Sequence, residues 1–261
     1  MRYGMCMQID SPERVEVVKN AGFDYIECGF CKLSRAEDEV FEAFKAELIK
    51  NDIKCEAANG FLPKDIPLIG DEYDEKKTVD YIEKGMKRGA EIGLKTVVFG
   101  SSGARKVPEG VSYAEGFRQL GEVLKNVISP LAKKYGITIV MEPLRKDECN
   151  IINTIKEGTM LAVLSGADNV HCLADIYHMI GEGDTLDDVR QLKGSLKHSH
   201  ISNPVSQKGL KRDFPADVNE YDYKGFIEAM EFAGCNTCSV EAQCVDFDSE
   251  TMAAGKVLKS L

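Results

Sequence analysis

Short apolar runs alternate with longer amphipathic segments along the whole chain. The short runs are rich in β-branched and aliphatic residues, which favours strands, and the longer segments carry apolar residues at three- and four-residue spacing, which favours helices. The predicted strands are residues 2–9, 24–30, 53–59, 95–100, 137–143, 170–176, 197–202 and 237–243. The predicted helices are residues 12–21, 35–50, 75–92, 113–135, 155–165, 185–194, 222–233 and 248–260.

Glycines follow most of the predicted helices, at the position where a left-handed residue closes a helix. They are Gly22, Gly93, Gly136, Gly166 and Gly234. Ser11 is a candidate cap for the start of the first helix.

Strict alternation of strand and helix predicts right-handed crossovers and a parallel sheet. Eight repeats of about 30 residues match a single (β/α)8 TIM barrel, and we expect residues 1–261 to form that one domain. A doubly wound open sheet is the alternative, but no glycine-rich fingerprint follows the first strand, where the sequence is MQIDSPERV. The two longest loops, 61–74 and 203–221, are of the kind that often covers an active site.

Composition narrows the classes of function. A formal charge of -10 and a pI near 5.1 argue against binding to nucleic acid, which needs positive potential. The first ten residues lack the basic and apolar regions of an export signal, and no apolar run is long enough to span a membrane. We therefore expect a cytoplasmic enzyme.

Nine cysteines without an export signal are typical of reduced thiols. Two C-x-x-C pairs, Cys28/Cys31 and Cys235/Cys238, raise the alternative of a four-thiolate zinc site. However, Cys28 lies near the end of one predicted strand and Cys235 before the start of another. The barrel would place the two pairs at opposite ends, so we expect separate thiols.

Ionisable residues end four consecutive predicted strands in the second half of the chain. They are Glu142 in TIVMEPL, Asp175 in VHCLAD, His200 in KHSH and Glu241 in CSVEA. Their spacings of 33, 25 and 41 residues each correspond to about one strand–helix repeat. The ends of parallel strands converge on one mouth of a barrel, so the four side chains are predicted to form a metal site.

Three carboxylates and one imidazole suit Mn²⁺, Mg²⁺ or Co²⁺, and Zn²⁺ also accepts such ligands. Mn²⁺ is the ion that we expect first. A single acid at a strand end is more often a helix cap or a solvated group, but four in register favour the metal.

The segments around these residues resemble those of a known family. The strings MEPLRKDECNIINT, LADIYHM, HSHISN and SVEA are similar to the metal-binding segments of the xylose-isomerase-like TIM barrel superfamily, in particular its sugar phosphate isomerase/epimerase branch, which includes ketose 3-epimerases. The resemblance covers essentially the whole chain. It implies a small carbohydrate substrate and one divalent ion, and it allows a homo-oligomer.

By this resemblance, Glu142 and Glu241 bind the metal and also act as the acid–base pair, with Asp175 and His200 as the other ligands. Removal of a proton beside a carbonyl needs a cation to hold the charge of the developing enediolate. Carboxylates on opposite sides of the sugar would epimerise a ketose at C3, whereas proton transfer between C1 and C2 would interconvert aldose and ketose. The sequence leaves both reactions open.

The resemblance also suggests substrate contacts. His178 is similar to the histidine that binds a substrate oxygen, and Glu148 to the acid that supports it. Arg212 resembles a substrate-contacting arginine, with a solvated loop cation as the alternative. Arg105, in FGSSGARKVPEG, is a candidate for an anion pocket or belongs to a flexible basic loop. Asn59 lies at the mouth of the third strand.

Several residues carry weaker signals. Phe61 is either an aromatic wall of the site or plain core. His198 is expected one layer below His200 by strand alternation, and His171 at the far end of the barrel. The chain has no Trp, although ketose 3-epimerases commonly pack one against the substrate.

Two other functions compete with an isomerase or epimerase. A non-catalytic sugar-binding barrel is one, because a fold does not determine a function. An apurinic endonuclease-like metallohydrolase is the other, but the resemblance implies that it would need a histidine-rich metal cluster and a basic groove. Four histidines and a charge of -10 argue against it.

Overall fold

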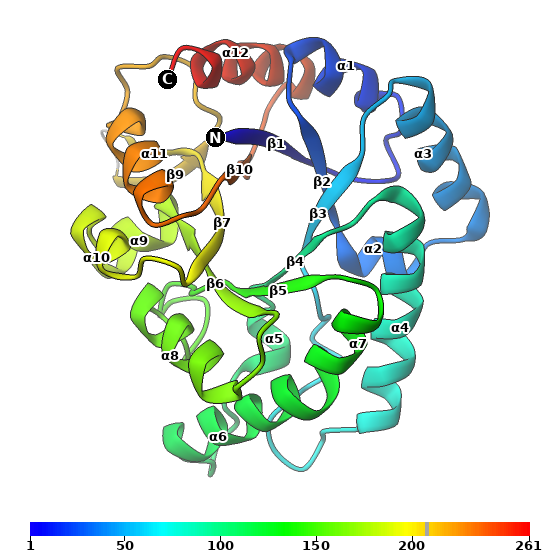
Figure 1. The fold of residues 1–261 in the computed structure, drawn as a ribbon, viewed down its shortest axis with the longest axis vertical. Helices are drawn as coiled ribbons and strands as arrows, with labels where there is room; N and C mark the ends of the chain where they lie inside the picture. Colours follow the sequence, from blue (N-terminus) through cyan, green and yellow to red (C-terminus); the bar gives the residue numbers. More distant parts are fainter. Residues whose placement is uncertain (207–208) are drawn as a thin grey trace.

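The computed structural model describes residues 1–206 and 209–261. Eight parallel strands close into a barrel, and helices surround it (Figure 1). The order around the barrel is β1-β10-β7-β6-β5-β4-β3-β2, so the first and last strands of the barrel are neighbours. The strands are β1 (Arg2–Met7), β2 (Tyr25–Gly29), β3 (Cys55–Asn59), β4 (Thr96–Phe99), β5 (Thr138–Met141), β6 (Val170–Asp175), β7 (Leu196–Ile201) and β10 (Thr237–Val240). The predicted TIM barrel is confirmed.

The helices lie outside the barrel and form most of the connections between consecutive strands. They are α1 (Arg14–Ala21), α2 (Phe30–Arg35), α3 (Asp38–Lys50), α4 (Glu75–Ile92), α5 (Ser102–Arg105), α6 (Tyr113–Val123), η1 (Leu124–Ile128), α7 (Ser129–Lys134), α8 (Ile155–Ser165), α9 (Ile176–Glu182), α10 (Leu186–Gln191), α11 (Tyr223–Phe232) and α12 (Phe247–Lys259). The short helices α2, α5 and α9 were not predicted. They follow directly on strand ends and carry little periodic signal.

The predicted helix 113–135 forms, but its middle turn is a π-helix, η1, between α6 and α7. Pro130 stands in the first turn of α7. Proline lacks an N–H and its ring crowds the carbonyl four residues earlier, and the wider π turn accommodates this ring. The first helix begins at Arg14, with Glu13 rather than Ser11 at its cap position.

All five glycines that were predicted to close helices have positive φ, between 66° and 93°. Gly22 shows how the cap works, because its N–H donates to the carbonyl oxygen of Lys19. An L side chain at this φ would be strained. The helix boundaries were therefore well predicted by the glycines.

The loop 203–221 departs from the prediction. It holds an antiparallel hairpin of β8 (Asn203–Ser206) and β9 (Gly209–Asp213), and residues 207 and 208 of this loop lie outside the described part of the chain. An isolated parallel bridge joins Asp213 to Gln243 and so ties the hairpin to the segment after β10. The loop 61–74, by contrast, contains neither helix nor strand.

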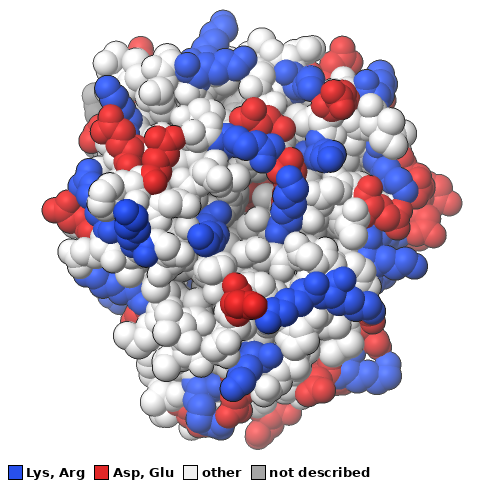
Figure 2. All heavy atoms as spheres, viewed as in Figure 1, with Lys and Arg blue, Asp and Glu red and all other residues white. Residues whose placement is uncertain are grey.

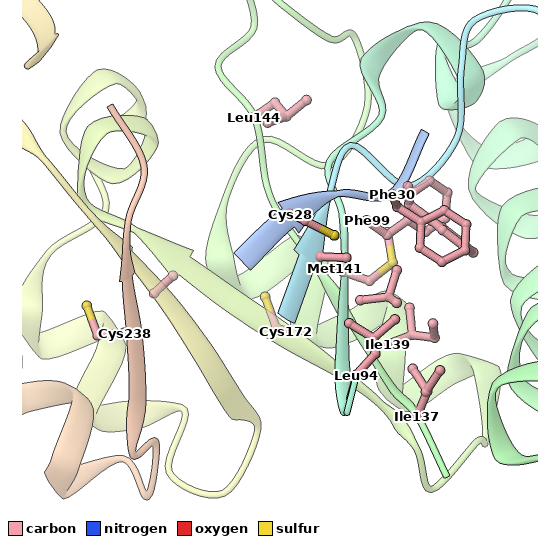
Figure 3. Close-up of a cluster of buried hydrophobic side chains, with 14 of the residues drawn as sticks. Cys28, Phe30, Leu94, Phe99, Ile137, Ile139, Met141, Leu144, Cys172 and Cys238 are labelled. Atoms are coloured by element: carbon pink, nitrogen blue, oxygen red, sulfur yellow. The ribbon is translucent and has the colours of Figure 1, made fainter. Parts of the chain in front are cut away.

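Alternation along the strands separates two apolar regions. On β4 and β5, Phe99, Ile139 and Met141 belong to the main core between the strands and the helices, where Phe30 also packs (Figure 3). A small separate cluster of Val98, Val140 and Leu173 lies apart from this core. The side chains of the main cluster therefore pack between the strands and the helices, and the alternate side chains of the strands point into the barrel.

The surface carries charges of both signs. On the face that Figure 2 shows, basic and acidic side chains are interspersed. Among residues 1–206 and 209–261, no helix combines the length and the apolar character needed to cross a membrane.

Candidate metal centre

The structure brings together the four ionisable residues that end β5, β6, β7 and β10. Each of Glu142, Asp175, His200 and Glu241 offers one ligand atom, and these atoms all lie within 4.8 Å of one another. The four strands are adjacent in the barrel, in the order β10-β7-β6-β5. Asp175 and His200 are strand residues, and Glu142 and Glu241 each follow the last residue of their strand. All four therefore lie at the same end of the barrel.

His200 stands in the middle of the cluster and is completely buried. Its Nδ1 lies 2.7 Å from Oε2 of Glu241 and 3.1 Å from Oε1 of Glu142. The same nitrogen is 3.6 Å from Oδ2 of Asp175. Nδ1 of His200 therefore faces all three carboxylates.

Asp175 both caps a helix and faces the cluster, two roles that were alternatives when only the sequence was considered. Its Oδ1 accepts a hydrogen bond of 2.7 Å from the backbone N–H of Tyr177 and caps helix α9. Its Oδ2 faces the ligand cluster. The cap fixes the carboxylate, so the capping of α9 and the cluster geometry support each other.

Arg212 reaches the cluster from β9. Its Nη2 contacts the carboxylates of Asp175 and Glu241 and lies 3.8 Å from Oε1 of Glu142. Its guanidinium also stands 5.2 Å from the ring centre of Tyr177. The guanidinium of Arg212 thus lies between the three carboxylates, and the β8–β9 hairpin places it there.

Charges in the cluster shift the pKa values in opposite directions. Burial opposes ionisation of Asp175, but Arg212 and then His178 outweigh it, so the pKa of Asp175 lies below 3.8. The pKa of Glu241 is lowered below 4.5 by the same balance of burial against Arg212 and His200. Burial disfavours the charged form of His200, but neighbouring carboxylates raise its pKa well above 6.5. Asp175 and Glu241 are therefore held as anions, which are the form that binds a cation.

The other predicted contacts lie around this cluster. Nδ2 of Asn59 donates to Oε1 of Glu241 at 2.9 Å. Nε2 of the buried His178 lies 3.9 Å from Asp175 and 4.0 Å from Glu142. Its Nδ1 has no hydrogen-bond partner among the described residues and is 3.9 Å from Glu148, which instead accepts from Nε of Arg145 at 2.9 Å.

Comparison with known proteins identifies the family. The family model of the xylose isomerase-like TIM barrel matches residues 15–261. The chain belongs to this family.

Two relatives of this barrel are epimerases. The 3-dehydro-D-guloside 4-epimerase of Escherichia coli (strain K12) is 26% identical over 231 residues, which cover 82% of this chain and 84% of that protein. The D-psicose 3-epimerase of Agrobacterium fabrum is 23% identical over 189 residues, covering 70% of this chain and 63% of that protein. The crystal structure of an E. coli 3-keto-D-glucoside 4-epimerase in its apo form covers the whole of both chains with a TM-score of 0.79 at 20% identity. The chain is accordingly an enzyme of the sugar isomerase/epimerase type.

Arg105 has a different position from the one expected. It is fully buried, and its guanidinium donates to the carbonyl oxygens of Phe99 at 2.9 Å and Glu142 at 2.8 Å. Both Nη groups are therefore directed to the backbone, while the buried Nε has no hydrogen-bond partner among the described residues. These contacts hold the chain just after β5 in this xylose isomerase-like barrel, and a substrate-binding role for Arg105 stays a prediction.

Sequence reasoning missed Glu27, in the middle of β2. This carboxylate is completely buried, and it lies 2.9 Å from Nε2 of His200 and 2.9 Å from Nε2 of His198. The signal that could have indicated its role was a charged residue inside the otherwise apolar strand YIECG. His198 lies one layer below His200, as predicted, with Nδ1 2.9 Å from Oγ1 of Thr237.

The remaining candidates lie in the core or at the far end. Phe61 is fully buried and packs edge-to-face against Phe30 and Phe99, so it is core rather than a wall of the site. His171 lines a cavity of about 310 Å³ together with residues at the starts of the strands. All nine cysteines are free, and the strand register places Cys28 beside Met7 while Cys235 precedes β10, at the opposite end of the barrel.

Proposed function

We propose that this barrel is a divalent-metal-dependent epimerase of a keto sugar, with Mn²⁺ as the preferred ion. The observation that carries the proposal is the convergence of Glu142, Asp175, His200 and Glu241, whose ligand atoms lie within 4.8 Å of one another. The relatives support the reaction class, because both are named epimerases.

The donor set fits a divalent ion. Three carboxylates and one imidazole, whose nitrogen would lose its proton to the metal, are ligands that Mn²⁺, Mg²⁺, Co²⁺ and Zn²⁺ accept. The lowered pKa values of Asp175 and Glu241 keep two of these acids ionised. The guanidinium of Arg212 between the acids supports the same conclusion, because it is a cation in the place where the carboxylates converge.

Glu142 and Glu241 are the proposed acid–base pair. They follow β5 and β10, which are separated by β6 and β7, so the two carboxylates approach the centre from different sides. A cation bound at this centre would stabilise the negative charge that develops on a substrate oxygen during proton removal. One glutamate takes the proton from carbon on one face of the sugar, and the other returns a proton to the opposite face.

His178, Asn59 and Arg212 are the proposed substrate contacts. Nδ1 of His178 is a buried nitrogen without a hydrogen-bond partner among the residues that the structure describes, and a substrate oxygen would satisfy it. Nδ2 of Asn59 already donates to Glu241, and its Oδ1, which accepts no hydrogen bond from the residues that the structure describes, is placed to accept one from a hydroxyl group. Glu148 is proposed to turn toward His178 from its 3.9 Å position when substrate binds.

The substrate class follows from what the relatives' reactions share. A 3-dehydro glycoside epimerised at C4 and a ketose epimerised at C3 both invert a carbon next to a ketone. The proton on such a carbon is acidified by the carbonyl, which is the chemistry that a metal and two carboxylates serve. A 3-keto glycoside is the first substrate to test, because the matching relative spans 82% of this chain.

We further propose a cytoplasmic location and no nucleic-acid partner. All nine cysteines are free thiols, the state that a reducing compartment maintains. The charge of -10 opposes binding to a phosphate backbone.

Proton exchange tests the proposal. Protein stripped of metal and reloaded with Mn²⁺ is incubated in D₂O with a 3-keto glucoside, D-psicose, keto acids and sugar phosphates, and the substrate is followed by ¹H NMR. We expect the signal of the proton beside the ketone to disappear and a deuterated epimer to accumulate, both only when metal is present.

Each alternative predicts another result in the same experiment. Exchange between C1 and C2 with an aldose product would identify an aldose–ketose isomerase. Binding of a sugar without exchange, under any of the four metals, would identify a sugar-binding barrel and would contradict the proposal.

A further inference from the structure

A buried carboxylate lies directly behind the proposed metal-binding histidine. Glu27 on β2 and His200 on β7 are separated in the barrel by β1 and β10, so their contact crosses the interior of the barrel. Oε1 of Glu27 lies 2.9 Å from Nε2 of His200, and both side chains are completely buried. The acid–base roles proposed for Glu142 and Glu241 do not involve this contact.

The contact selects which nitrogen of His200 faces the ligand cluster. Glu27 can only accept a hydrogen bond, so Nε2 keeps its hydrogen, and Nδ1, which faces Glu142, Asp175 and Glu241, is the nitrogen that would give up its proton to a bound metal. A histidine that ligates a metal through one nitrogen is held in orientation and tautomer by the partner of the other nitrogen.

Glu27 also contacts a second histidine, His198, which lies one layer farther from the ligand cluster. Its second oxygen, Oε2, lies 2.9 Å from Nε2 of His198, whose Nδ1 is 2.9 Å from Oγ1 of Thr237. Each carboxylate oxygen therefore accepts from a different histidine. A buried carboxylate with two such partners has one stable orientation.

Cys6, Glu27 and His200 also form a group with ligand atoms within 4.8 Å, which raises the alternative of a second metal site. The hydrogen bonds argue against it, because both oxygens of Glu27 are already used by imidazole nitrogens. The geometry favours support of His200 rather than a second ion.

We propose that Glu27 is a positioning residue that fixes the tautomer and the ring orientation of His200, so that Nδ1 is presented to the metal. The proposal rests on the metal site of the proposed function. It assigns a role to a residue that contacts neither the substrate nor the ion, and it extends the site by one layer down the axis of the barrel.

Metal binding to the metal-free protein tests this role without any substrate. Calorimetric titration with Mn²⁺ compares the wild type with Glu27→Leu, which removes both acceptors, and Glu27→Gln, which keeps one. We expect the dissociation constant to rise by roughly 10- to 100-fold for Glu27→Leu, the range for loss of a partner behind a ligand. Glu27→Gln should fall between Glu27→Leu and the wild type.

Ser129→Ala is the matched control. Ser129 is a buried residue in the first turn of α7, and the substitution removes one hydrogen bond of 2.6 Å to Asn169, just before β6 and away from Glu27 and His198. This variant should bind Mn²⁺ as the wild type does, even if its melting temperature falls. A purely structural role of Glu27 would likewise lower the melting temperature and leave the affinity for metal unchanged.

The outcomes separate the two proposals. A wild type that binds no divalent ion overturns both the proposed function and this inference. A wild type that binds Mn²⁺, with both Glu27 variants within twofold of it, overturns the inference alone. If Glu27→Leu does not fold, Glu27→Gln decides, and wild-type affinity in that variant contradicts the positioning role.

Discussion

Gly100 faces Glu142 so closely that a methyl group on its Cα would overlap Oε2 of the carboxylate. Gly100 follows β4, next to β5, and its lack of a side chain leaves the space that the glutamate occupies. We therefore expect Gly100→Ala to displace the carboxylate of Glu142 and to weaken Mn²⁺ binding by about tenfold or more, as measured by calorimetry.

Gly121→Ala is the control for this change. Gly121 lies in α6, and a Cβ there would meet only Cδ1 of Leu161 at an ordinary 3.6 Å. The substitution should leave metal affinity unchanged and raise the stability by up to about 1 kcal/mol through helix propensity. Equal metal affinity of Gly100→Ala and Gly121→Ala would contradict the role given to Gly100.

The acid–base and ligand roles should separate by mutation. Glu241→Gln keeps an oxygen ligand but cannot accept a proton, so we expect proton exchange to fall by roughly 10²- to 10⁴-fold with a smaller loss of metal affinity. Asp175→Ala removes a proposed ligand and the cap of α9, and should mainly release the metal. Deuterium incorporation and Mn²⁺ titration measure the two effects. Near-normal turnover of Glu241→Gln would refute the acid–base assignment.

Arg105 should contribute to stability rather than to substrate binding. Arg105→Met removes the side-chain donor to the buried carbonyl oxygens of Glu142 and Phe99, and the Phe99 oxygen keeps only its bond from the backbone N–H of Glu142. We expect a loss of about 2–4 kcal/mol in the free energy of unfolding, measured by urea denaturation. An anion pocket predicts the reverse pattern, with unchanged stability and a raised KM for a phosphorylated or acidic sugar.

Glu56 links stability to pH at the opposite end of the barrel. Arg2 donates to both of its oxygens, at 2.7 and 3.0 Å, and Lys95 adds a third bond of 3.0 Å. Burial opposes ionisation, but Arg2 and Lys95 outweigh it, so the pKa of Glu56 is below 4.5.

A pKa lowered by folding means that the stabilisation is fully present above about 4.5 and is lost as the pH falls through the folded-state value. Glu56→Gln should therefore cost about 1 kcal/mol at pH 7, and the difference from the wild type should shrink in acid. Thermal unfolding between pH 3 and 7 measures this. In an Arg2→Met background much of the pH dependence due to Glu56 should disappear, and a constant difference at all pH values would contradict the assignment.

Local patterns were sufficient for the elements that depend on neighbouring residues in the chain. The positive φ of Gly22 and Gly166 arises within a few residues of each helix end. The strands of the barrel were recognised for the same reason. The π turn before Pro130 was missed, because a periodic pattern does not distinguish a π turn from an α turn.

The candidate site divides in the same way. The ends of β5, β6, β7 and β10 were predictable, because parallel strands in consecutive repeats end at one mouth. The position of Arg105 was not predictable. A loop arginine beside small residues has the same sequence pattern whether its donors bind an anion or a backbone carbonyl.

The sequence by itself determined the eight-fold alternation of strand and helix and which polar residues end the strands. Only the tertiary structure decided that Glu27 lies behind His200 and that Arg212 reaches the carboxylates from a hairpin. The physical reason is that these contacts join strands or loops that are not neighbours in the chain. They depend on how the barrel closes and on its register, which no local pattern of side chains encodes.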